Sequence, residues 1–260
     1  MFNLISWNVA GRVKKLPMQA NGLAEHEPHV IALQEVTATT IPLWRSELEA
    51  REYQIITSFD LASDRESLVG GRKYCVLTAS RWPMEALPPT DFDLPWPERV
   101  LSVIVHSPWG EIECHNVHLP AGVSHGWIKV ETFEGIYGRL AGESKLPRIL
   151  CGDFNSPRAE RTDGVTVPFG DHKERWSSAE LSVITGLAEY DLGDVYRHLH
   201  GFGKQDVSWV MWRLGKQYSR RFDHVFASQR LNLKSCGYLH SLREQGFSDH
   251  SPIEACFAPG

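Results

Sequence analysis

Short apolar runs of strand length recur from one end of the chain to the other, and they constrain the fold more than any other feature. About eleven such runs are separated by polar loops or amphipathic segments. They cover residues 2–7, 29–34, 53–58, 74–79, 100–106, 111–118, 147–151, 206–212, 221–227, 232–239 and 252–257. No purely apolar stretch approaches the roughly 20 residues that a membrane-spanning helix needs. The pattern therefore predicts a globular protein with many strands.

Helical periodicity occurs between some of these runs. Residues 127–140 carry apolar side chains at spacings of three and four, which predicts a helix with one buried face. A second helix is expected near Pro42, because proline favours the first helical turn. A third is expected to begin at Ser177, since Ser177 and Glu180 form a capping-box pattern.

The order of these elements excludes some architectures. Strand-like runs follow one another over 100–118 and again over 206–257, so mixed sheets with outer helices fit better than a purely parallel, doubly wound sheet. No repeat or linker-like segment interrupts the chain, so we expect a single domain over residues 1–260. Turns or long loops are expected at 70–72, 88–97 and 156–175.

Composition narrows the class of protein further. The 260 residues are 42% hydrophobic and 23% charged, which excludes disordered and collagen-like chains. The net charge is −5, so a polyanion would have to meet a local basic patch. Five cysteines form no C-x-x-C pair and lie mostly in or beside apolar runs, which indicates reduced core thiols. With no basic leader at its start, the sequence predicts a cytoplasmic protein with no membrane contact and no obligate protein partner.

Polar side chains stand where several apolar runs begin or end. Read singly, each fits an ordinary turn or helix-dipole role. Together they form a set of oxygen and imidazole groups without thiolates, which suits Mg²⁺ or Mn²⁺ and phosphate chemistry. The set is Asn8, Glu35, His118, Asp153, Asn155, Asp223, Asp249 and His250.

Local spacing gives the first expectations about Asp153 and its neighbours. Asp153 and Asn155 are two residues apart, so on extended backbone they share a face while Phe154 points into the core. Gly152 is expected to let a ligand approach the backbone closely.

Spacing also bears on the histidines. Asp249 and His250 are adjacent, so both can serve one site only from a loop, and Asp223 is a candidate carboxylate to orient His250. His115 and His118 are three apart, on opposite faces of a strand, so we do not expect a zinc pair.

Six ordered motifs resemble the endonuclease/exonuclease/phosphatase superfamily. They are Trp7-Asn8-Val9, Leu33-Gln34-Glu35, Asn116-Val117-His118, Gly152-Asp153-Phe154-Asn155, Arg221-Phe222-Asp223 and Ser248-Asp249-His250. The resemblance covers nearly the whole chain. It implies an α/β (α+β) fold, a four-layered sandwich of two central mixed β-sheets flanked by helices, with the site at one end of the sheets.

The resemblance also implies residue roles. Glu35 would be the main ligand of the metal ion, with Asn8 and Asp249 nearby, directly or through water. Asp153 would orient or deprotonate the attacking water, and Asn155 would hold that water or a phosphate oxygen.

The histidines are assigned roles in the same way. His250, oriented by Asp223, would stabilise the transition state, and His118 would contact the same phosphate. Such a site needs an in-line water, a Lewis acid and donors placed where charge develops.

The motifs favour the exonuclease III-like branch over inositol polyphosphate 5-phosphatases and tyrosyl-DNA phosphodiesterases. Arg-Phe-Asp-His is nearer the nuclease pattern, and Gly-Asp-Phe-Asn favours the same side. Abasic-site specificity is not expected, because four positions depart from the pattern of abasic-site enzymes. These are His118 in place of Tyr, Thr37 in place of a basic residue, Arg220 in place of an aromatic residue, and Ala121 in place of Asn.

Basic clusters beside two of the predicted site loops point to a nucleic acid. Positive side chains hold phosphates, and tryptophans between them can stack on bases or sugars. The candidate substrate-binding residues are Arg12, Arg213, Lys216, Arg220, Trp209 and Trp212. The alternative is a solvated basic loop with two core tryptophans.

These features lead to one main hypothesis and two alternatives. We expect divalent-metal-dependent hydrolysis of phosphodiester bonds, most of all by a DNA endonuclease or exonuclease of the exonuclease III-like branch. The first alternative is a phosphatase or a phospholipid or small-molecule phosphodiesterase of the same superfamily. The sequence shows no membrane-inserting apolar hairpin, which speaks against lipid. The second alternative is a non-catalytic binding module that keeps the fold.

Overall fold

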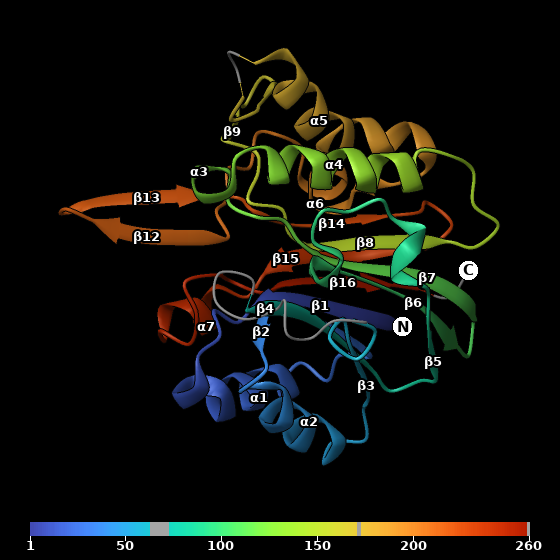
Figure 1. Ribbon diagram of the computed structural model, residues 1–260. Coiled ribbons are helices and arrows are strands. Elements are labelled where there is room, and N and C mark those ends of the chain that lie inside the picture. Colours follow the sequence, from blue (N-terminus) through green and yellow to red (C-terminus); the bar gives the residue numbers. More distant parts are fainter. Residues whose placement is uncertain (63–72, 171–172, 259–260) are drawn as a thin grey trace.

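Two six-stranded sheets lie face to face between outer helices in the computed structural model (Figure 1). The structure describes residues 1–62, 73–170 and 173–258. The turn expected at residues 70–72 lies outside these described residues. The predicted four-layered α/β sandwich with two central mixed sheets is confirmed.

The first sheet has one parallel strand pair, β1 with β2, among antiparallel neighbours. Helices α1 (Leu16–Ala24) and α2 (Ile41–Glu49) cover its outer face (Figure 1). Its strands, in spatial order, are β15 (Leu233–Tyr238), β16 (Ile253–Phe257), β1 (Phe2–Asn8), β2 (Val30–Thr37), β4 (Tyr74–Ser80) and β3 (Gln54–Thr57).

The second sheet also has one parallel pair, β7 with β8. Helices α4 (Trp127–Leu140) and α5 (Glu174–Ile184) cover its outer face. Its strands, in spatial order, are β11 (Gly193–Asp194), β14 (Asp223–Ala227), β8 (Arg148–Asp153), β7 (Gly110–His118), β6 (Val100–Ser107) and β5 (Met84–Ala86).

Shorter elements lie between these strands and helices. The helices are α3 (Gly122–His125), α6 (Val195–His200) and α7 (His240–Glu244), and the 3-10 turns are η1 (Val13–Lys15), η4 (Pro89–Asp91), η5 (Pro97–Arg99) and η6 (Gly186–Tyr190). Two small hairpins pair β9 (Ala159–Glu160) with β10 (Thr166–Val167), and β12 (Trp209–Arg213) with β13 (Lys216–Arg220). Among the described residues, no helix is both long and apolar enough to cross a membrane.

Period-two alternation in the central strands explains where the site lies. In β1, Leu4 packs between the sheets, whereas Ile5 and Trp7 pack against the helices. In β8, Cys151 packs between the sheets, whereas Leu150 packs against the helices. The last residues of these strands therefore bring polar side chains into the space between the sheets, at the end where both parallel pairs finish.

Several local expectations are wrong. Helix α5 begins at Glu174, and Ser177 lies inside it with its hydroxyl donating to Gly170 O, so no capping box forms. The carboxylate of Glu180 instead accepts hydrogen bonds inside the fold. The strand expected over 206–212 begins only at Trp209.

The structure shows why a residue with a side chain would not fit at Gly152, which the sequence analysis did not predict. Its φ is +145°, and a Cβ there would lie 1.9 Å from Val117 O on the neighbouring strand. The close approach that the structure shows is between β8 and β7, and a ligand near Gly152 stays a prediction.

Candidate active site

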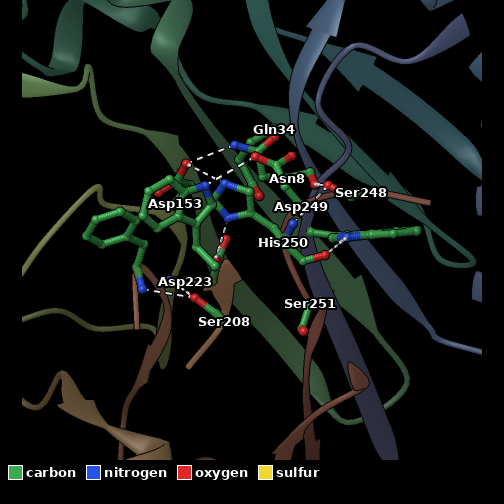
Figure 2. Close-up of polar contacts among 12 residues, drawn as sticks. Asn8, Gln34, Asp153, Ser208, Asp223, Ser248, Asp249, His250 and Ser251 are labelled. Atoms are coloured by element: carbon green, nitrogen blue, oxygen red, sulfur yellow. Dashed lines mark hydrogen bonds and ion pairs between the residues drawn. The ribbon is translucent and has the colours of Figure 1, made fainter. Parts of the chain in front are cut away.

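Strand ends from both sheets place acids, amides and imidazoles together (Figure 2). Asn8 ends β1, and His118 and Asp153 end the parallel pair β7 and β8, where they lie opposite each other. Asp223 begins β14 opposite Asp153 on the other side. The strand pairing therefore determines that these residues meet.

Asn8 joins two of the carboxylates. Its Nδ2 donates to Asp153 Oδ2 at 2.8 Å and to Glu35 Oε1 at 3.1 Å. Its Oδ1 accepts from the backbone N–H of Ala10 at 3.0 Å. In this arrangement Asn8 positions the two acids, and direct ligation of a metal ion through Oδ1 stays a prediction.

Glu35 reaches the site through an irregularity in β2. The register of β2 against β4 shifts between Leu33 and Val36, and Glu35 has a φ of +56°. A bulge of this kind turns one side chain away from the regular alternation, at a cost in backbone strain. It places Glu35 beside Asp153 while the flanking apolar residues stay buried.

Asp153 is held by a turn with Asn155. The backbone N–H of Asn155 donates to Asp153 Oδ1 at 2.8 Å, and its Nδ2 lies 3.3 Å from Oδ2. Asn155 has a φ of +49°, so the backbone is not extended as expected, although Phe154 is buried as predicted. Burial raises the pKa of Asp153 to about 7, an effect that the positive charge of His250 opposes. A carboxylate with this pKa suits proton transfer near neutral pH.

His250 is paired with Asp223, as the sequence predicted. His250 Nδ1 lies 2.8 Å from Asp223 Oδ2, and Nε2 lies 3.9 Å from Asp153 Oδ2. Burial by itself would lower the pKa of His250, but Asp223 and then Asp153 raise it to about 10. The ring is therefore a buried imidazolium that directs its Nε2–H into the site.

His118 faces the same space from the other side. Its Nε2 lies 3.7 Å from Glu35 Oε1 and 3.9 Å from Asp153 Oδ2. Burial, and next the charge of Arg99, hold the pKa of His118 well below its usual value. His115 lies on the other face of β7 against Phe92, so the two histidines do not share a site.

Serine hydroxyls support the loops, and the sequence analysis did not identify their role. Ser248 Oγ donates to Asn8 O and accepts from the N–H of His250, which ties that loop to β1 (Figure 2). Ser208 Oγ accepts from the N–H groups of Phe222 and Asp223. Of these two serines, only Ser248 belongs to one of the six sequence motifs.

Asp249 lies at the rim of the site. Its side chain is 37% exposed, and it accepts from Trp209 Nε1 at 3.2 Å and pairs with Arg12 Nη2 at 3.5 Å. Arg12 also donates to Gly246 O. Arg12 is thus held within the protein at the site edge, and a substrate contact by Arg12 stays a prediction.

Two groups of side chains have the spacing of metal ligands among the described residues. Within each group, the donor atoms lie within 4.8 Å of one another. One group is Glu35, His118 and Asp153, and the other is Asp153, Asp223 and His250. The second contains the charged imidazolium, so the first fits a cation better. Its two carboxylates suit a hard divalent ion.

A cavity of about 830 Å³ opens beside Asn155. Three of the predicted substrate-binding residues, Trp209, Arg213 and Arg220, line it, whereas Lys216 and Trp212 do not. Ala121, at another position that departs from the abasic-site pattern, also lines it. Phe169, Trp176, Tyr218 and Phe222 complete an aromatic wall, with Lys129 nearby.

The β12–β13 hairpin projects from the body of the protein (Figure 1). Leu214 at its tip is 97% exposed and Trp212 is 68% exposed, so Trp212 is not a core residue. The sequence analysis did not identify this exposed hairpin, and the absence of a membrane-inserting apolar hairpin stays a prediction. The periodicity analysis missed β13, because its residues, Lys216–Arg220, are mostly polar and solvated on both faces.

Arg221 of the Arg-Phe-Asp motif is buried in an ion-pair cluster. It contacts Glu160 at 2.6 Å and 2.7 Å and Asp194 at 2.6 Å. The cost of burying Glu160 is exceeded by its pairing with Arg221, so the pKa of Glu160 falls to about 2. Arg221 thus fixes the start of β14, while its neighbour Arg220 faces the cavity.

The fold and the site together define a hydrolase of phosphate esters, with acid, base and cation-binding groups at one end of two mixed sheets. The chain belongs to the endonuclease/exonuclease/phosphatase family, whose model matches residues 5–250. Enzymes of this family use divalent metal ions, and the carboxylates of Glu35 and Asp153, which lie within 4.8 Å of each other, fit such an ion. Comparison with curated proteins finds no match.

Several solved structures share the fold. An AP endonuclease from Archaeoglobus fulgidus has a TM-score of 0.73 at 20% identity, over 99% of this chain and 99% of that chain. The 3′ phosphatase NExo from Neisseria, bound to a product DNA hairpin, has 0.71 at 20% identity, over 99% and 100%. TDP2 of D. rerio, complexed with single-strand DNA product, has 0.69 at 16% identity, over 99% and 98%.

Proposed function

We propose that the protein hydrolyses phosphodiester bonds of DNA with Mg²⁺ or Mn²⁺, as a nuclease similar to the exonuclease III-like branch. One observation carries the proposal: His250, paired with Asp223, and the cation-binding carboxylates of Glu35 and Asp153 face one point. Proton acceptor, charge stabiliser and Lewis acid are the three components that phosphodiester hydrolysis needs.

Each residue then has a stated task. Asp153 orients the attacking water and takes its proton, while Asn155 holds Asp153 and a phosphate oxygen. His250 donates its Nε2–H to the phosphoryl oxygen on which charge develops, and Asp223 keeps it charged. Glu35 would hold a divalent ion, which when bound would supply Lewis-acid stabilisation of the same charge. Asp249 stays a proposed ligand through water.

The surroundings of the site favour DNA over a small phosphate ester. The cavity beside Asn155 carries Arg213 and Arg220 among aromatic side chains, a combination that suits phosphates and stacked bases or sugars. It is also large enough for a nucleoside. The three compared structures include two with DNA product, which supports the same substrate class. The single domain over residues 1–260 and the cytoplasmic location remain proposals.

The direct test uses end-labelled duplex DNA, either intact or with one abasic-site analogue. We expect purified protein to cleave it with Mg²⁺ or Mn²⁺ and not with chelator. Glu35→Gln removes one charged donor, so it should raise the metal concentration for half-maximal rate by about tenfold or more. Glu25→Gln, an exposed acid outside the site, is the matched control.

Two results would contradict this proposal, and a third would contradict the role of Glu35. Cleavage that persists in chelator would remove the metal from the reaction. No cleavage of any DNA substrate under any metal condition would exclude DNA as the substrate. An unchanged metal titration in Glu35→Gln would take Glu35 out of the ligand set.

The hairpin provides a separate prediction about substrate binding. If Arg213 and Lys216 neutralise phosphates, the double variant Arg213→Glu/Lys216→Glu should reduce the slope of log K against log salt by about two. Fluorescence anisotropy of labelled DNA across a salt series measures this slope. Lys234→Glu, an exposed lysine on β15, should leave the slope unchanged. If the double variant has the same slope as Lys234→Glu, Arg213 and Lys216 do not contact phosphates.

One observation favours a second candidate function. The exposed Trp212 and Leu214 at a basic hairpin tip also suit the surface of an anionic membrane, as in a phospholipid phosphodiesterase. Cosedimentation with phosphatidylserine vesicles distinguishes the two. Vesicle binding that Leu214→Asp abolishes, together with an unchanged DNA salt slope in the charge-reversed variant, would support the lipid substrate.

A further inference from the structure

Arg99 is a buried arginine that the proposed chemistry does not yet use. It ends η5 and precedes β6, and its side chain is 3% exposed. The pairing of β6 with β7 matches Val100 with Val117, so Arg99 stands across the ladder from His118. The antiparallel register therefore delivers a guanidinium directly behind a histidine of the site.

The contact between the two side chains determines where the imidazole proton lies. Arg99 Nη1 lies 2.6 Å from His118 Nδ1. A guanidinium has five N–H donors, no acceptor, and does not lose its proton in proteins, so it can only donate. Nδ1 must therefore be the acceptor, with a free lone pair. The proton of a neutral His118 is then on Nε2.

The surroundings hold Arg99 in this position. Its guanidinium lies 5.4 Å from the ring centroid of Tyr74 and 5.5 Å from that of Trp96. Cation–π contacts of this geometry stabilise a desolvated arginine. Among the described residues, Arg99 Nε has no hydrogen-bond partner. Arg99 Nη1, by contrast, has His118 Nδ1 as its partner. Burying a guanidinium costs desolvation free energy, so its position here points to a function.

The other ring nitrogen faces the reacting groups. His118 Nε2 lies 3.7 Å from Glu35 Oε1 and 3.9 Å from Asp153 Oδ2. A nitrogen that carries a proton can donate to an oxygen there but cannot bind a metal ion. His118 therefore leaves the cation to the carboxylates, although its position alone would allow ligation.

We propose that Arg99 is a positioning residue that fixes His118 as the neutral Nε2–H tautomer. His118 is then a hydrogen-bond donor to a phosphoryl oxygen, and neither a metal ligand nor a base. The positive charge behind the ring polarises the Nε2–H bond and strengthens that donation. The assignment of the tautomer is independent of the proposed function, and only the contact with the phosphoryl oxygen rests on it.

The test reads the tautomer without any substrate. In protein labelled with ¹⁵N-histidine, two-bond ¹H–¹⁵N correlation spectra distinguish the neutral Nε2–H ring, the neutral Nδ1–H ring and the imidazolium. His118→Gln assigns the signal. At neutral pH we expect the Nε2–H pattern in the wild type and in Arg99→Lys, because lysine is also a donor without an acceptor. We expect the pattern to be lost in Arg99→Met.

Kinetics give the second readout. Arg99→Met should lower kcat by about tenfold to a hundredfold with a smaller change in KM, and Arg99→Lys should recover much of the loss. Arg81→Met is the matched control, because Arg81 also lies over an aromatic ring, Tyr53 at 4.8 Å, but follows β4 at the opposite end of the sheet. In Arg81→Met, the tautomer pattern of His118 and kcat should be those of the wild type.

The two readouts separate the failure of this inference from the failure of the proposed function. An Nδ1–H ring or an imidazolium at His118 in the wild type would overturn the inference, whatever the substrate. An unchanged pattern and kcat in a folded Arg99→Met would do the same. The expected tautomer in a protein that cleaves no DNA would leave Arg99 assigned and overturn only the nuclease proposal. If Arg99→Met does not fold, the wild-type and Arg99→Lys spectra still decide.

Discussion

Asp153→Asn is expected to lower kcat by about a thousandfold or more while the protein stays folded. The variant removes the carboxylate proposed to take a proton from the attacking water, and loss of such a base costs about 10²–10⁴ in rate. Asparagine has the same shape and can still accept from Asn155 N through Oδ1. Burial already disfavours the carboxylate, which favours the variant, but the new amide Nδ2 would face the donor Asn8 Nδ2. We therefore expect the melting temperature to fall only modestly.

Rates under saturating metal and circular-dichroism melting curves measure both effects. Asp163→Asn, an exposed aspartate paired with Arg161 at the surface, is the matched control and should behave as wild type. A folded Asp153→Asn with more than about a tenth of the wild-type kcat would remove Asp153 from the proton-transfer role.

The second large effect concerns the Asp223–His250 pair. His250→Gln and Asp223→Asn should each lower kcat by about a hundredfold to a thousandfold, since either change abolishes the imidazolium that faces the substrate. The double variant should be no slower than the slower single variant, because both changes remove the same charge. This result would show that the pair acts as one unit.

Stability should follow a different pattern from activity. His250→Gln leaves the Asp223 carboxylate buried without its partner, which costs about 3–5 kcal/mol of unfolding free energy. Asp223→Asn should cost less, because a buried His250 without that partner can lose its proton. The double variant leaves a neutral pair, so urea titration should show that much of this stability returns, although kcat does not. Multiplicative losses of kcat in the double variant, or no recovery of stability, would argue against the paired imidazolium.

Much of the fold could be predicted from the sequence because its signals are local. Alternating apolar residues identified the central strands, and α4 matches the predicted helix at 127–140. The capping-box expectation at Ser177 was wrong because Glu180 accepts hydrogen bonds from Phe169 and Trp176 within the fold. The mostly polar strand β13 was missed because no buried face marks it.

Arg99 shows a signal that was present in the sequence but not used. The strand-like runs 100–106 and 111–118 are separated by only four residues, 107–110, which indicates a short hairpin turn, and such a turn restricts the register between the strands. That register places Arg99 opposite His118. The distance between them and the burial of the guanidinium required the packed structure.

The sequence by itself determined which polar residues end the strands, and hence the family and the set of residues at the site. Those features are encoded by the period of a strand and the order of motifs, which do not depend on the rest of the chain. Only the tertiary structure decided which residues act together. Asn8 bridges Glu35 and Asp153, Arg221 is held in an internal cluster, and His118 receives its proton arrangement from Arg99. Burial, pKa and hydrogen-bond partners arise between segments far apart in the chain, so no local pattern contains them.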